Sequence, residues 1–90
     1  MNLEILTPER KLYSGTVYGV QLPGEDGMFE VLEKHAPLVA SLRSGSLKIL
    51  KDKIGGSAAS YTIQSGFVEV IHNNVTVLVE GATAVDTLNE

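Results

Sequence analysis

The chain has 90 residues, no cysteine and a formal net charge of −4, from seven Lys and Arg against eleven Asp and Glu. This length suits one small domain, and the lack of cysteine excludes a disulfide scaffold, a thiolate metal site and a cysteine nucleophile. The acidic balance argues against a nucleic-acid partner, which requires a basic face, and no apolar run approaches the roughly 20 residues of a membrane-spanning helix.

Short runs of β-branched residues, separated by Gly, Pro, Asn and Asp, dominate the sequence. Ten Val, five Ile and six Thr contribute to these runs, a pattern typical of an all-β domain. No helical period of ten or more residues interrupts it. The sequence therefore predicts a small all-β sandwich of about ten short strands, with no substantial helix.

The N-terminal segment begins with an alternating run. Leu3 and Ile5 alternate with polar neighbours over residues 2–6, which predicts a strand with one buried face. Pro8 has no N–H to donate to a strand ladder, so the strand is expected to end there. The segment lacks the charged and apolar regions of a signal peptide, so we expect a cytoplasmic protein.

One long strand is predicted over residues 12–22, with Gly15 and Gly19 as bulges or points of close backbone approach. The next five residues, 23–27, contain one Pro, two Gly and two acids, and we expect them to form an exposed turn. Further on, Pro37 restricts the preceding residue to extended geometry.

The C-terminal half reads as two hairpins. Strands are expected at residues 47–51 and 61–64, with a loose loop over residues 52–60 between them. Two further strands, 67–72 and 75–80, are separated by Asn73 and Asn74, and Asn tolerates the positive φ of a tight hairpin turn. One face of the last strand should be apolar, because three residues share it: Val75, Val77 and Val79.

Candidate catalytic and metal-binding residues are few. The two histidines, His35 and His72, have no metal-ligand spacing, and Ser65 lacks the G-x-S-x-G pattern of a hydrolase nucleophile. No phosphate-binding motif is present. We therefore expect no catalytic residue, no metal, no cofactor and no ATP binding.

Acidic residues gather at Glu25, Asp26, Glu30 and Glu33. They are consistent with a solvated turn, with a protein-docking loop, or with Ca²⁺ binding or a carboxylate pair for acid–base chemistry, although their spacing does not match an EF-hand loop. His35, which follows closely, is either a structural loop histidine or a partner contact.

The order of several motifs resembles the N-terminal β-sandwich of the epsilon subunit of the F-type ATP synthase. The resemblance covers about residues 2–86. The motifs include Glu25-Asp26-Gly27 and Ser65-Gly66-Phe67, and the specific combination is His35-Ala36-Pro37-Leu38 with Asn74-Val75-Thr76-Val77-Leu78 downstream. We expect residues 1–84 to form this sandwich and residues 85–90 a C-terminal tail, without the helical hairpin that commonly follows.

This resemblance implies a non-catalytic rotor subunit of the central stalk, which docks on the gamma subunit and on the ring of c subunits to couple proton transport to ATP synthesis. It implies a peripheral position on the cytoplasmic face of a bacterial inner membrane, with membrane contact only through the complex. The partner contacts implied are Glu25, Asp26, Gly27, Met28, Phe29, His35, Ala36, Pro37 and Leu38.

Two other hypotheses come from different classes of protein. One is a free-standing β-domain that binds a small ligand. The other is an enzyme with an acid pair at Glu30 and Glu33.

Overall fold

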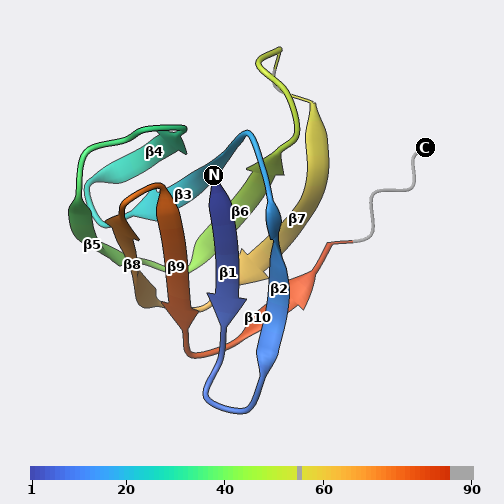
Figure 1. Cartoon of the computed structure of the whole chain (residues 1–90). Coiled ribbons are helices and arrows are strands. Elements are labelled where there is room, and N and C mark those ends of the chain that lie inside the picture. Colours follow the sequence, from blue (N-terminus) through green and yellow to red (C-terminus); the bar gives the residue numbers. More distant parts are fainter. Residues whose placement is uncertain (55, 86–90) are drawn as a thin grey trace.

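The computed structural model describes residues 1–54 and 56–85 and contains ten strands (Figure 1). Among these residues no helix is found, and so none that is long and apolar enough to cross a membrane. The predicted all-β class and strand number are confirmed. The strands are β1 (Asn2–Leu6), β2 (Lys11–Thr16), β3 (Gly19–Gly24), β4 (Gly27–Leu32), β5 (Leu38–Leu42), β6 (Gly45–Leu50), β7 (Ser57–Ile63), β8 (Gly66–Ile71), β9 (Asn74–Val79) and β10 (Ala82–Ala84).

The strands form one curled sheet in the order β10-β7-β6-β3-β5-β8-β9-β1-β2, and β4 pairs with the remaining side of β3. Only one residue pair, Gly24 with Leu42, joins β3 to β5. The sheet therefore turns over at this point into two layers, one of β10, β7, β6, β3 and β4 and the other of β5, β8, β9, β1 and β2 (Figure 1). The pair β1–β9 is parallel, whereas the other pairs are antiparallel.

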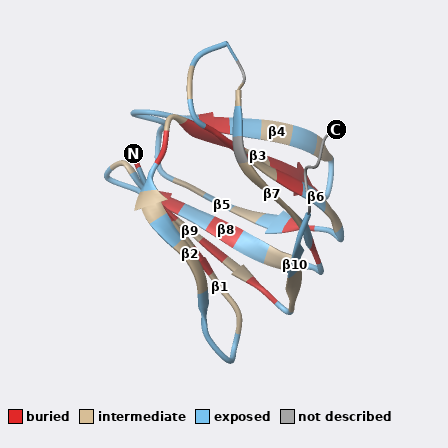
Figure 2. Cartoon of the chain, turned by 90° about the vertical axis from the view of Figure 1, so that its right-hand side faces the viewer, coloured by how far each residue is buried: buried red, intermediate tan, exposed pale blue. Residues whose placement is uncertain are grey.

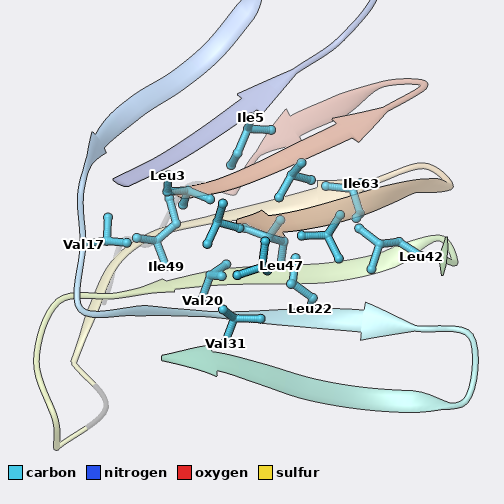
Figure 3. Close-up of a cluster of buried hydrophobic side chains, with 14 of the residues drawn as sticks. Leu3, Ile5, Val17, Val20, Leu22, Val31, Leu42, Leu47, Ile49 and Ile63 are labelled. Carbon is cyan, nitrogen blue, oxygen red and sulfur yellow. The ribbon is translucent and has the colours of Figure 1, made fainter. Parts of the chain in front are cut away.

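The core lies between the two layers, because alternate residues of each strand face inward. Buried and exposed segments alternate along β8 (Figure 2). In the close-up view, Leu3 and Ile5 of β1 point toward side chains of the opposite layer, such as Val20 (Figure 3). On β9 the predicted apolar face is confirmed, since three of its residues are at most 4% exposed: Val75, Val77 and Val79.

The prediction of one long strand over residues 12–22 is wrong. The chain leaves β2 in one layer at Thr16 and enters β3 in the other layer at Gly19. At the crossing, Val17 N–H donates to the carbonyl of Met1 at 2.8 Å, and Tyr18 N–H donates to the carbonyl of Leu50 at 3.1 Å. These partners are remote in sequence, so the local pattern of residue types did not reveal the break.

The predicted loop over residues 52–60 is too long, because β7 begins at Ser57. The turn is closed by Lys51 N–H, which donates to the carbonyl of Gly56 at 2.9 Å, and by Asp52, whose Oδ1 accepts from Gly56 N–H at 2.9 Å. Pairing with β6 extends β7 through small residues that resemble a loop in the sequence.

The last hairpin turn lies one residue earlier than predicted. Ile71 pairs with Asn74, so the two turn residues are His72 and Asn73, with φ values of +50° and +64°. Positive φ at both central positions is typical of a type I′ hairpin turn, whose backbone twist matches the twist of the flanking strands. The register places His72 in this turn because the core requires Val70 and Val75 to face inward.

The predicted tail at residues 85–90 lies mostly outside the described residues, of which Val85 is the last. The division into residues 1–84 and 85–90 therefore stays a prediction.

Candidate docking groove

The acidic turn joins β3 to β4 at one corner of the sheet. Pro23 and Gly24 are buried residues of β3, so the predicted exposed turn is narrower than residues 23–27. Only Glu25 and Asp26 are exposed turn residues, and neither has a positive φ. Gly27 has a φ of +131°, which side-chain-bearing residues rarely adopt, so glycine is required where β4 begins.

Met28 and Phe29 belong to β4 rather than to a loop, which corrects their predicted setting. Strand geometry therefore sends their side chains to opposite faces. Phe29 is half-buried and packs against the core, whereas Met28 lies on the outer face and is 57% exposed. Of the two, Phe29 is the residue that contributes to the space between the layers.

The segment between β4 and β5 is held in a tight conformation. Lys34 has a φ of +65°, and its N–H donates to Oδ1 of Asn73 at 2.8 Å. His35 N–H donates to the carbonyl of Leu32 at 3.2 Å, and its Nδ1 lies 2.8 Å from the carbonyl of Ala36. Because a carbonyl only accepts, Nδ1 is the donor in this contact.

The two predicted segments meet at one groove of about 540 Å³, which we name the β4–β5 groove. It is lined by Gly24, Glu25, Asp26, Phe29, His35, Leu38, Ala40 and Ser41. Of the nine predicted contact residues, five line it: Glu25, Asp26, Phe29, His35 and Leu38. The other four do not: Gly27, Met28, Ala36 and Pro37.

Main-chain bonds fix the acidic end of the groove. Glu25 N–H donates to the carbonyl of Ser41 at 3.2 Å, and Arg43 N–H donates to the carbonyl of Pro23 at 2.9 Å. These bonds tie the end of β3 to β5, so the acidic turn and the floor of the groove keep a fixed relation.

The groove combines an apolar floor with a charged rim. Phe29, Leu38 and Ala40 are half-buried and pack against the core, while Glu25 and Asp26 are exposed at one end. Such a surface suits a partner that brings apolar side chains and a positive charge. Among the described residues, no cluster of three or more His, Asp or Glu side chains could hold a metal ion.

The two carboxylates of the enzyme hypothesis, Glu30 and Glu33, contact different partners. A carboxylate oxygen of Glu30 accepts from Gln21 Nε2, which lies 2.6 Å away across β3 and β4. Glu33 instead approaches the N-terminal ammonium of Met1 at 3.7 Å. This arrangement favours structural roles for both carboxylates.

Sequence reasoning missed three groove residues: Gly24, which precedes the acidic turn, and Ala40 and Ser41, which follow Leu38 after Val39. It also missed an apolar surface on the outer face of β5 and β8, where Val39 is 69%, Phe67 46% and Ile71 43% exposed. A strict alternation search along residues 38–42 and 66–71 would have assigned these residues to the outer face.

Comparison with known families identifies this architecture as the β-sandwich domain of an ATP synthase subunit family. The model of the family "ATP synthase, Delta/Epsilon chain, beta-sandwich domain" matches residues 1–85. The chain belongs to this ATP synthase delta/epsilon family, which confirms the resemblance drawn from the motifs.

Curated relatives are named ATP synthase epsilon chain. The relative from Chlorobium limicola is 43% identical over 79 residues, which make up 87% of this chain and 86% of the relative. The relative from Sulfurimonas denitrificans is 45% identical over 85 residues, or 94% of this chain and 64% of the relative. The chain thus spans most of the first relative and less than two thirds of the second.

A solved structure of the Euglena gracilis mitochondrial ATP synthase, comprising OSCP, F1 and the c-ring, contains a chain with the same fold. The TM-score is 0.82 at 20% identity, over 97% of this chain and 54% of that one. The central stalk and c-ring of the Tetrahymena thermophila mitochondrial ATP synthase give a TM-score of 0.74 at 16% identity, over 91% and 64% of the two chains. These likenesses establish the fold.

Proposed function

We propose that this chain is a rotor subunit of the central stalk of an F-type ATP synthase, which docks on the gamma subunit and on the c-subunit ring. In this role it couples proton transport to ATP synthesis without catalysing a reaction. It sits at the cytoplasmic face of a bacterial inner membrane and touches the membrane only through the complex. Residues 1–84 are the part that docks.

One observation carries this proposal: in a member of the delta/epsilon family, the two segments expected to contact partners lie on a single groove. Glu25 and Asp26 lie at its end, and His35 and Leu38 lie along its side. An acidic rim beside an apolar floor favours a basic protein surface, and charge complementarity there sets orientation and association rate more than affinity.

The direct test is capture of this chain by purified gamma subunit at a series of salt concentrations. Reversing the turn charges with the double variant Glu25→Lys and Asp26→Lys should weaken capture at low salt. The loss should shrink as salt rises, because exposed charges are screened beyond about 8 Å at physiological ionic strength.

The matched control carries the same change in charge away from the groove, as Glu9→Lys with Glu69→Lys. Both residues are exposed, Glu9 between β1 and β2 and Glu69 on β8, and neither lines the groove. An equal loss in both double variants would assign the effect to overall charge. Unchanged capture of the turn variant at low salt would remove the acidic turn from the interface.

The same preparation tests the absence of a catalytic or nucleotide-binding role. Titration calorimetry of the chain with ATP should show no binding. A micromolar dissociation constant would contradict the proposal and favour the alternative of a small-ligand-binding domain.

A further inference from the structure

The strand β4 has a free edge. It pairs with β3 and with no other strand of the described residues, and six residues, Gly27–Leu32, make up its length. Strand edges with unpaired main-chain groups attract further strands, and proteins usually protect them with Lys, Pro or a covering segment. The sequence of β4, Gly-Met-Phe-Glu-Val-Leu, contains neither Lys nor Pro.

Two observations show which main-chain groups face this edge. The carbonyl oxygen of Val31 points toward β3, where it lies 3.0 Å from the position that a Cβ would take at Gly19. The carbonyl of Leu32 instead accepts from His35 N–H. Because successive residues direct their main-chain groups to opposite sides of a strand, Met28 and Glu30 present theirs to the free edge.

Across the β4–β5 groove, β5 also has main-chain groups directed toward this space. Its pairing partner β8 lies on the other side, and the carbonyl of Ser41 accepts from Glu25 N–H rather than from β8. By the same alternation, Val39 directs its main-chain groups to the groove side. The groove thus lies beside these two strand edges, and half-buried apolar side chains of both strands line its floor.

We propose that the β4–β5 groove binds an extended segment of a partner polypeptide, which adds to the free edge of β4 as a further antiparallel or parallel strand. Alternate apolar side chains of that segment lie on Phe29, Leu38 and Ala40, and a Lys or Arg lies beside Glu25 and Asp26. Main-chain hydrogen bonds supply affinity in this mode, and the side-chain contacts supply specificity. The proposal rests on the proposed docking function and specifies how the partner is recognised.

The length of the free edge and the charge at the end of the groove both favour an extended segment of a partner polypeptide. Five residues from Met28 to Leu32 offer an edge of about 16 Å, enough for a short strand. A second copy of the chain is a poor occupant, because each copy carries a net charge of −4 and so brings no excess of the positive charge that Glu25 and Asp26 favour.

Hydrogen exchange measured by NMR on the chain, alone and with purified gamma subunit, tests this mode residue by residue. The amides of Met28 and Glu30 should exchange fast in the free chain and at least tenfold more slowly in the complex. The amides of Phe29 and Val31, which face β3, should be slow in both states and serve as internal controls.

The backbone variant Glu30→Pro removes one edge N–H, at a position where an edge strand accommodates proline. We expect gamma binding to weaken about tenfold, the effect of one lost hydrogen bond that leaves a partner carbonyl unpaired. The matched variant Glu30→Gln keeps the N–H and should bind like the parent chain. Thermal melting of both variants checks that the fold is retained.

The outcomes separate the two proposals. Gamma binding without protection of Met28 and Glu30 would overturn strand addition and leave the docking function standing. No gamma binding by the parent chain would overturn both. In the absence of gamma, protection of these two amides could instead grow with the concentration of the chain. That result would assign the edge to a second copy of the chain and overturn the proposal of a different partner polypeptide.

Discussion

The substitution Gly66→Ala should be one of the most damaging single-methyl changes in this domain. A Cβ built on Gly66 would lie 2.0 Å from the carbonyl oxygen of Leu78 and 2.7 Å from Cα of Val79. Real Cβ atoms do not approach other heavy atoms closer than 3.0 Å, so the β9 backbone would have to move by about 1 Å. Both contacted atoms are main-chain atoms, and no side-chain rotation relieves the clash.

The magnitude follows from the cost of overpacking. Forcing extra methylene groups into a packed site costs about 1–3 kcal/mol, and a clash with backbone at the Gly66–Val79 pair belongs at the upper end. A loss of about 3 kcal/mol is a large fraction of the roughly 5–15 kcal/mol that stabilises a small domain. It should lower Tm by about 12–24 °C, since each kcal/mol corresponds to about 4–8 °C at this size.

The assay is thermal and urea unfolding followed by circular dichroism, with Gly81→Ala as the matched control. A Cβ on Gly81 would lie 3.4 Å from Oε1 of Gln64, the end of a flexible side chain. This variant should stay within about 1 kcal/mol of the parent, with a slight gain from reduced unfolded-state entropy. Equal melting of the two variants would refute the close approach of β8 and β9 at this position.

Two further variants probe the core and the support of the groove. Val77→Asp should destabilise the domain by more than about 3 kcal/mol in urea melts, because it places an unpaired charge at a fully buried site. The control Thr62→Asp lies at an exposed position between Ser46 and Thr83 and should cost less than about 1 kcal/mol. Similar losses in the two variants would mean that the assigned strand faces are wrong. Asn73→Gly should keep the hairpin turn, since glycine adopts positive φ, but it removes the side-chain acceptor of Lys34 N–H. The amide of Lys34 should therefore exchange faster by NMR, while the amides of Val70 and Val75 are unchanged. An unaltered exchange rate at Lys34 would show that this hydrogen bond does not hold the segment between β4 and β5.

The amino-acid sequence alone determined the β class and the inward face of β9. Both depend on information held within a few residues: β-branched runs between turn residues, and the two-residue period of Val75, Val77 and Val79. The family could also be inferred from the sequence, because the resemblance depends on the order of short motifs along the chain and not on their positions in space.

Local patterns failed where contacts with other parts of the fold decide the structure. The break at Val17 and Tyr18 depends on the carbonyls of Met1 and Leu50, and the early start of β7 depends on its pairing with β6. The shift of the last turn to His72 and Asn73 follows from which valines face the core. In each case strand pairing, a main-chain hydrogen bond or core packing overrode a reasonable local preference.

The groove illustrates the same division. Glu25 and His35 stood out in the sequence as an acidic turn and an unusual loop, but they lie ten positions apart along the chain. They line one groove because β4 runs away from the turn and β5 returns toward it in the other layer, where Gly24 meets Leu42. The free edge of β4 has the same origin, since only the pairing of the whole sheet decides which strands, here β2, β4 and β10, have one neighbour among the described residues.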